Sequence, residues 1–213
     1  MYKLIIVLFL IVVVGIMGYF YLHRPIVSAE DHSSIETLQD PQQYRLFDFR
    51  NFPVSSKGLD AKIKTIAKYK ISAVILSKKR YATEWTSKVS PFDLALGWGE
   101  VSNPENYKHI KVRQTMRWYQ YKTDRECKIT PYYISSHSSN HHIIPASDNI
   151  RNAILFAKKH DKIHLEGYLV NVSGKYKNKN VHWRSSLKRT DTGKGSCEIL
   201  YVTSVKLGTN IYR

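Results

Sequence analysis

In residues 162–174, KIHLEGYLVNVSG, every second residue from Ile163 through Leu165 and Gly167 to Leu169 is apolar or glycine, which puts these four on one face. A repeat of two residues is that of a half-buried strand, whereas a helix repeats every 3.6 residues. A glycine inside such a strand permits a sharp bend. The stretch therefore predicts a bent strand packed on a core, and it favours a β-rich fold.

Strand patterns continue on both sides of this stretch. Residues 68–82 have a β-branched centre flanked by lysines, and residues 110–122 alternate well enough for one strand. Residues 181–189 and 197–208 have the pattern of two more strands. Several short strands and an internal glycine are typical of a small barrel.

Two segments predict helices instead. In SPFDLALGWG, residues 90–99, Ser90 is a good N-cap and Asp93 falls in the first turn, where the helix dipole favours it. In residues 147–162, Ser147 can cap a helix that has an apolar stripe. The whole pattern predicts a β-rich α+β domain: a small OB-like or partly open β-barrel with two or three short helices, behind one N-terminal transmembrane helix.

The N-terminal stretch LIIVLFLIVVVGIMGYFYL, residues 4–22, contains no charge. As a helix it would reach roughly 28 Å, close to the hydrocarbon thickness of a bilayer. A transmembrane anchor over residues 1–24 is favoured, because the apolar core of a signal peptide is shorter, although Val27-Ser28-Ala29 leaves a cleaved signal peptide open. Residues 25–58 follow as a linker or entry segment, and residues 59–213 form a basic domain.

Charge is the second strong feature of the sequence. The formal net charge is +16 at pH 7, and residues 30–213 account for +14 of it. Such a charge attracts nucleic acid, anionic headgroups or an anionic wall polymer, or it serves solubility. Because single N-terminal spans usually export the domain that follows, we expect a single-pass protein of the bacterial inner membrane with its C-terminal domain on the extracytoplasmic side.

A histidine-rich stretch, SSHSSNHHIIPASDN, spans residues 135–149. His137, His141 and His142 are candidate metal ligands, since catalytic zinc usually needs three protein ligands. No HExxH or CxxC pattern frames them, and adjacent histidines point oppositely in a strand. A polar connection, in which Asn140 and the serines satisfy backbone groups, is favoured over a metal site. A functional loop without metal stays open.

A second polar stretch, HWRSSLKRTDTGKGSCE, spans residues 182–198. Its backbone N–H groups, with Arg189 and Lys194, could hold an anion, although the spacing of a P-loop is absent. The alternative is an ordinary turn between two strands. A hydrolase would need an activated Ser or Cys beside a base. The candidate catalytic residues of the two stretches are His137, Asn140, His142, Arg189, Asp191, Cys197 and Glu198.

The chain has two cysteines, Cys127 and Cys197. One disulfide and two separate thiols are both open, because the sequence does not fix their distance.

Aromatic side chains lie among basic ones in RWYQY, residues 117–121, and in HWR, residues 182–184. They could stack on bases or sugars at a barrel face, although most Trp and Tyr residues pack in cores. The candidate ligand-binding residues are Arg117, Trp118, Trp183, Arg184, Arg189 and Lys194.

Five segments carry a resemblance to a known family: SPFDLALGWG (90–99), RWYQY (117–121), SSNHHIIPA (138–146), LEGYLV (165–170) and WRSSLKRTDTGKGSCEILYV (183–202). Together they resemble an uncharacterised family of small bacterial proteins with an N-terminal membrane segment. The resemblance covers roughly residues 65 to 205. It implies a bacterial membrane or exported protein, and it implies no reaction, cofactor or ligand.

The sequence therefore predicts a membrane-anchored extracytoplasmic binding or scaffolding module for an anionic ligand or a protein partner. The partner would be an anionic polymer or a protein of the envelope; nucleic acid is not favoured, and no cofactor is expected. The alternative is an envelope-associated hydrolase that uses residues 137–142 and 189–198. An enzyme needs His142 near Asp191 or Cys197 around a cleft, whereas binding needs a contiguous basic or aromatic patch.

Overall fold

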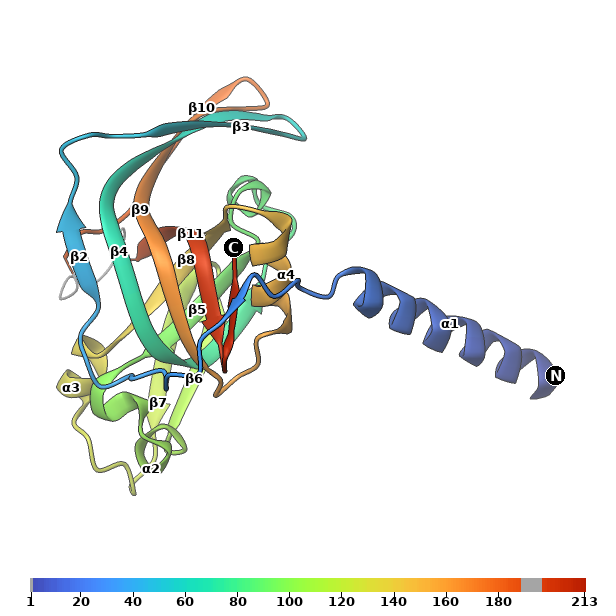
Figure 1. The fold of residues 1–213 in the computed structure, drawn as a ribbon, viewed down its shortest axis with the longest axis horizontal. Helices are drawn as coiled ribbons and strands as arrows, with labels where there is room; N and C mark the ends of the chain where they lie inside the picture. Colours follow the sequence, from blue (N-terminus) through green and yellow to red (C-terminus); the bar gives the residue numbers. More distant parts are fainter. Residues whose placement is uncertain (1, 189–196) are drawn as a thin grey trace.

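The computed structural model describes residues 2–188 and 197–213. Over these residues the chain is mostly β-sheet with a few helices and an apolar helix at the N-terminus (Figure 1). The helices are α1 (Tyr2–Leu22), α2 (Pro104–Tyr107), α3 (Pro131–Ser136) and α4 (Asp148–Phe156), with 3-10 turns η1 (Trp85–Lys88) and η2 (Gly99–Ser102). The strands are β1 (Ala29–Glu30), β2 (Gln42–Arg45), β3 (Asn51–Ser56), β4 (Leu59–Arg80), β5 (Phe92–Gly97), β6 (Ile110–Thr115), β7 (Trp118–Thr123), β8 (Ser138–Pro145), β9 (Lys162–Tyr176), β10 (Lys179–Arg184), β11 (Glu198–Leu207) and β12 (Asn210–Tyr212).

Five strands pair in a closed ring: β4 with β5, β5 with β8, β8 with β11, β11 with β9, and β9 with β4. The β8–β11 pair is parallel and the other four are antiparallel. A parallel pair needs a crossover connection, which here runs through α4, β9 and β10. The prediction of a β-rich domain is confirmed, and the alternating stretch that carried it lies within β9.

Gly167 lies where β9 approaches β11. A Cβ atom built on this glycine would lie 1.9 Å from the backbone oxygen of Tyr201. The register between the two strands shifts beside this contact, between Val202 and Ser204. The glycine therefore permits a close approach of two backbones at the point where the ring closes.

The main core is formed by buried side chains from all five ring strands. Its fully buried members include Tyr69, Ile71, Leu94, Leu96, Ile143, Leu165, Leu169 and Leu200. Helix α4 adds Ile150 and Ile154 to this core, and the Ser147 hydroxyl accepts a hydrogen bond from the Ile150 N–H. The helix predicted behind the Ser147 cap is confirmed. Burial of each such aliphatic side chain contributes about 1.5–3 kcal/mol.

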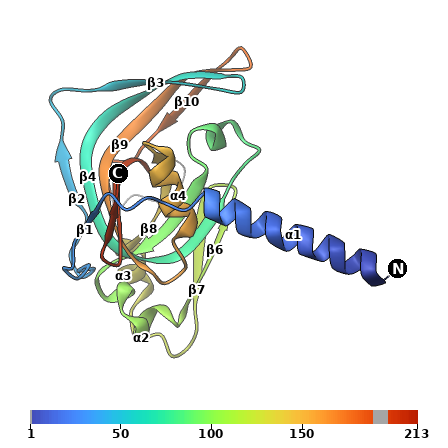
Figure 2. The same ribbon diagram turned by 45° about the vertical axis from the view of Figure 1, so that its right-hand side comes forward.

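Strands β4 and β9 extend beyond the ring and curve over to pair with β3 and β10 (Figures 1 and 2). This extension has the strand order β3–β4–β9–β10. One of its faces buries a second core that includes Leu59, Ile63, Val172 and Ile199. The opposite face is polar, and the difference between the two faces decides where a ligand can bind.

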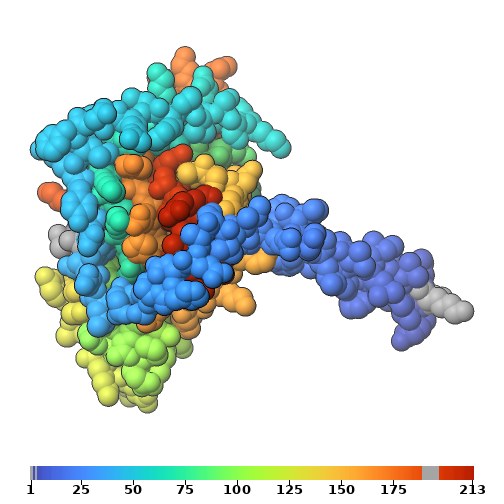
Figure 3. Space-filling view, in the orientation of Figure 1, coloured from blue at the N-terminus to red at the C-terminus, as the bar shows by residue number. Residues whose placement is uncertain are grey.

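Residues 25–58 contain β1, β2 and β3, and each of these strands pairs with the body. The segment runs across one face of the body (Figure 3). Helix α1 projects away from the body (Figures 1 and 2). Its residues Leu4–Leu22 are long and apolar enough to span a membrane, with a mean hydropathy of 2.8 and no burial against the domain over the most apolar stretch.

The helix predicted over residues 90–99 is wrong. Phe92–Gly97 form β5, and all six residues are buried. A short apolar run fits a buried helix or a buried strand equally well, so the pattern alone does not decide. Here β5 lies between β4 and β8, whose hydrogen bonds on both sides outweigh the capping signals at Ser90.

Residues 110–122 form two strands rather than the single strand predicted. β6 and β7 are joined by Met116 and Arg117, which have φ values of 49° and 69°. Two residues with positive φ make the tight turn that matches the twist of a hairpin. Neither residue is Gly, Asn or Asp, so the sequence carries no turn signal there. The two cysteines are separate and half-buried.

Candidate functional site

The three histidines of the histidine-rich stretch separate in space. His137 ends α3 and stacks on Tyr133, with ring centroids 3.8 Å apart. His141 is buried, with Nε2 3.1 Å from the hydroxyl of Tyr69, and burial lowers its pKa to about 3. His142 follows it on β8 and has different partners. Over residues 2–188 and 197–213, no group of three His, Cys, Asp or Glu side chains could hold a metal ion.

Asp93 is the centre of a buried polar network. Its side chain has no solvent exposure, and Oδ1 accepts a hydrogen bond of 2.6 Å from Arg117 Nη1. The same oxygen lies 2.9 Å from His142 Nδ1, and Oδ2 accepts a bond of 3.3 Å from Asn140 Nδ2. The strand register explains the contact, because Asp93 of β5 lies opposite His142 of β8. These partners offset the cost of burying a carboxylate.

Arg117 reaches this carboxylate from the β6–β7 turn. Its Nε donates to Glu84 Oε2 at 2.8 Å, and its Nη2 donates to the backbone carbonyl oxygen of Ser90 at 3.0 Å. The guanidinium carbon lies 4.0 Å from the ring centroid of Tyr81, and only 12% of the side chain is exposed. Arg117, a candidate anion ligand, is thus engaged by internal partners, and these contacts hold its left-handed backbone in place.

Trp183 of β10 covers the network. Its ring lies 4.7 Å from the His142 ring and makes an edge contact of 6.1 Å with Trp85. The Arg117 guanidinium lies 5.6 Å from the same indole. Four residues predicted from different segments therefore meet here: Arg117, Asn140, His142 and Trp183. Trp118, by contrast, lies on β7 with 43% of its surface exposed.

His142 and Asp93 are arranged like a general base and its orienting acid. If Nδ1 carries the proton and donates it in a hydrogen bond to Asp93, Nε2 would be the proton acceptor. Burial opposes catalysis, because only 4% of the His142 side chain is exposed. No hydroxyl or thiol in the described part of the chain hydrogen-bonds to His142. The geometry therefore fits a structural network.

The second polar stretch meets the first along the β8–β11 pair. Glu198, at the start of β11, lies opposite His141, and Cys197 precedes it. Both lie near Tyr119, whose hydroxyl bonds Ser138 at 3.0 Å and whose pKa burial raises to about 12. Three further candidates, Arg189, Asp191 and Lys194, lie outside the described residues.

The polar face of the extension carries a basic patch, which we define as Lys62, Lys64, Lys175, His182 and Arg184. All five side chains are exposed. The register places them in neighbouring rows: Lys62 and His182 flank Ser173, and Lys64 and Arg184 flank Asn171. No ion pair found between described residues involves any of the five. The three lysines and Arg184 thus carry charge without an ion-pair partner in the described residues, and the Lys64 ammonium lies 4.6 Å from the ring centroid of Phe49.

Sequence reasoning identified Arg184 alone in the basic patch, and in the buried network it identified the partners of Asp93 but missed Asp93 itself. Asp93 has a usable signal, since a carboxylate within the apolar run FDLALG requires a buried partner. Lys62 and Lys64 alternate with apolar residues, which marks one exposed strand face. Lys175 joins them only through the β4–β9 register, which the sequence does not contain.

Comparisons with protein families, curated proteins and solved structures find no match to this chain. Its function is therefore argued from its geometry.

Proposed function

We propose that the protein is a membrane-anchored binding or scaffolding module that holds an anionic polymer on the basic patch. The observation that carries the proposal is the patch itself: five exposed basic side chains lie on one face of three paired strands. Asp60 is the acid nearest to them in the register, directly opposite Lys175. Clustered charge of one sign raises the local concentration of an oppositely charged ligand.

We further propose that the five-stranded ring is an OB-like barrel. The ring of five strands with one parallel pair, and the helix α4 between β8 and β9, support this assignment. OB-folds usually bind ligands on the face of their second and third strands, which here would be β5 and β8. That face carries the buried Asp93 network under the hairpin and Trp183, so the basic patch is the better ligand site.

The proposed location is the bacterial inner membrane, with α1 as a single span and the domain on the extracytoplasmic side. The length and hydropathy of Leu4–Leu22 support the span. An anionic polymer of the envelope is the favoured ligand, because it would be in reach of a tethered domain. Nucleic acid has the same charge and is the less favoured ligand at that location.

The alternative, an envelope-associated hydrolase at the 137–142 and 189–198 stretches, has one supporting observation, the hydrogen bond between His142 and Asp93. We favour binding because His142 is buried and because no hydroxyl or thiol in the described part of the chain hydrogen-bonds to it.

The test measures binding of the full chain in detergent micelles to two polymers, polyphosphate and polyglutamate. The variant Lys62→Glu/Lys64→Glu/Arg184→Glu reverses charge on three exposed strand positions. We expect it to weaken binding at least tenfold, about 1.4 kcal/mol, and we expect wild-type binding to weaken as salt rises.

The matched control is Lys111→Glu/Arg113→Glu/Lys122→Glu, which changes the net charge equally on the exposed side of the β6–β7 hairpin. Equal loss of binding in both variants would show attraction to overall charge and would overturn the patch as a site. No binding of either polymer by the wild type would overturn the proposed function.

A further inference from the structure

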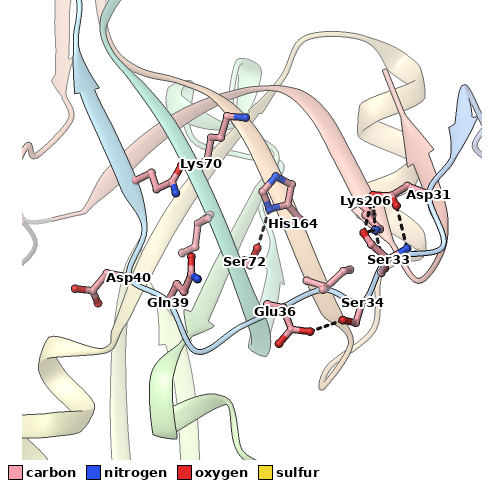
Figure 4. Close-up of a pocket in the computed structure, with 13 residues that line it drawn as sticks. Asp31, Ser33, Ser34, Glu36, Gln39, Asp40, Lys70, Ser72, His164 and Lys206 are labelled. Carbon is pink, nitrogen blue, oxygen red and sulfur yellow. Dashed lines mark hydrogen bonds and ion pairs between the residues drawn. The ribbon is translucent and has the colours of Figure 1, made fainter.

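A polar cavity of about 290 Å³ lies far from the Asp93 network, between the segment of residues 31–42 and the sheet (Figure 4). Its floor is one row across three strands: Ser72 of β4, His164 of β9 and Lys206 of β11 are direct neighbours in the register. Its roof is the segment, which Lys206 holds by bonding Asp31 at 2.7 Å and the Ser33 oxygen at 2.8 Å.

The floor contains a continuous chain of hydrogen bonds. The Ser72 hydroxyl oxygen lies 2.8 Å from His164 Nδ1. The other ring nitrogen of His164, Nε2, lies 3.2 Å from Glu166 Oε1. Figure 4 shows Ser72 and His164 joined on adjacent strands beneath the segment. A hydroxyl, a base and an orienting carboxylate therefore follow one another in order.

The carboxylate fixes the tautomer of the imidazole. Glu166 accepts only from a protonated Nε2, which leaves Nδ1 without a proton and able to accept from Ser72. Burial raises the pKa of Glu166, but bonds from Lys70 and His164 lower it more, so the carboxylate stays charged at neutral pH. Lys70 is 2.5 Å from the same oxygen.

Cross-strand pairing alone brings Ser72 beside His164 and Lys70 beside Glu166. It does not dictate that hydroxyl, imidazole and carboxylate bond in this order, nor that a cavity lies above them. The two ring nitrogens are exchanged relative to the usual serine hydrolase, but the proton relay has the same direction. Side-chain exposures of 29% for His164 and 36% for Glu166 leave the relay open to a small molecule.

We infer that Ser72, His164 and Glu166 form an acyl-transfer site for a small polar carboxylic ester. Ser72 Oγ attacks the acyl carbon while its proton passes to His164 Nδ1. The tetrahedral adduct collapses, the ester C–O bond breaks, and the same proton leaves with the alcohol. Water then attacks the acyl-enzyme, gives a proton to Nδ1, and releases the acid while Ser72 regains its proton. Lys70 and Lys206 line the cavity, each paired with a carboxylate, Glu166 and Asp31 respectively.

The test treats the full chain in detergent micelles with a fluorophosphonate probe. An activated serine displaces fluoride and forms a P–O bond, so the protein gains the mass of the probe less HF. We expect one adduct, on the peptide that contains Ser72, and at least tenfold slower labelling in His164→Gln. Glu166→Gln should slow labelling less and shift its pH profile.

Ser55→Ala is the matched control, because Ser55 is an exposed serine on β3 whose register partner is Asp60 rather than a histidine. It should label like the wild type, whereas Ser72→Ala should not label. Absence of an adduct on Ser72 in the wild type would overturn the inference, and so would unchanged labelling in His164→Gln. Polymer binding to the basic patch is a separate readout and does not depend on either result.

Discussion

Asp93 has three hydrogen-bond partners and no contact with solvent. One partner, His142, comes from the neighbouring strand, and another, Arg117, comes from a hairpin turn with a strained backbone. The turn is held in place by the network rather than by its own conformational preference. A single carboxylate thus fixes the position of the β6–β7 hairpin over the ring.

We therefore expect Asp93→Ala to lower the free energy of unfolding by about 3–5 kcal/mol, because Arg117 would lose its buried counter-ion and keep only the partly exposed Glu84. Urea denaturation followed by tryptophan fluorescence measures the change. The control is Glu105→Ala, which removes an exposed ion pair with Lys108 and should leave the unfolding free energy almost unchanged. A loss for Asp93→Ala as small as that of the control would show that the network does not stabilise the fold.

At this scale the sequence predicted residue types better than partners. The sequence predicts a catalytic role for His142 and ligand binding for Arg117 and Trp183. In the structure these three residues contact one another or a common partner, Asp93. Their meeting depends on the β5–β8 register and on an unusual turn. Neither is a local property of the sequence, so spacing along the chain could not reveal the cluster.

The segment of residues 31–42 is the element that roofs the cavity over Ser72. Besides β2 pairing and two backbone bonds, from Asp31 N–H to the Thr209 oxygen and from Gly99 N–H to the Thr37 oxygen, side-chain contacts attach it. Lys206 bonds Asp31 and Ser33, Thr37 bonds Ser102 at 2.8 Å, and the Trp98 indole donates to Asp40 at 2.9 Å. The attachment of this segment therefore depends on the charge state of a carboxylate. A strand held by a full ladder of backbone hydrogen bonds would depend on it less.

Hydrogen bonds from Lys206 and from Ser33 hold the pKa of Asp31 well below its usual range. A carboxyl whose pKa is lower in the folded state stabilises the fold above its unfolded pKa, about 3.9, and that contribution is lost as the pH falls through the folded value. We expect the segment to stay attached at neutral pH and to loosen progressively below about pH 4.

Hydrogen–deuterium exchange of residues 31–36, corrected for intrinsic rates, measures this loosening. Asp31→Asn should produce faster exchange at pH 7, while Glu105→Gln, which removes an exposed carboxylate elsewhere, should not. Equal protection of the segment in wild type and Asp31→Asn at pH 7 would contradict the role of this ion pair.

The predicted type of element was correct where the apolar repeat extended over many residues. β9 has strict alternation over many residues, and α4 has both a cap and a stripe. β5 has only six residues, all apolar except Asp93, so capping signals and strand pairing competed and pairing prevailed. The β6–β7 hairpin was missed because alternation continues through a turn without glycine.

The whole molecule consists of an apolar helix that projects from a basic β-rich body (Figures 1 and 2). Phe20 near the end of α1 makes an edge contact with Phe156 at 5.8 Å. Asn149 bonds both backbone groups of Ile26 and the oxygen of Arg213. The chain therefore joins the body at the exit of α1, so the domain would sit close to any membrane that α1 spans.

We expect the intact chain to remain in the membrane fraction after alkaline carbonate extraction, with its mass unchanged, because a 19-residue apolar helix inserts stably.

A fusion of alkaline phosphatase to the C-terminus should be active in bacterial cells, since that enzyme folds only outside the cytoplasm, and a β-galactosidase fusion at the same point should be inactive. Release into the soluble fraction with loss of residues 1–29 would identify a cleaved signal peptide, and the opposite fusion pattern would place the domain in the cytoplasm. Only the cytoplasmic result would remove the reason for choosing an envelope polymer as the ligand, because a cleaved signal peptide still exports the domain. In the cytoplasmic case, nucleic acid would become the anionic polymer within reach of Lys62, Lys64 and Arg184.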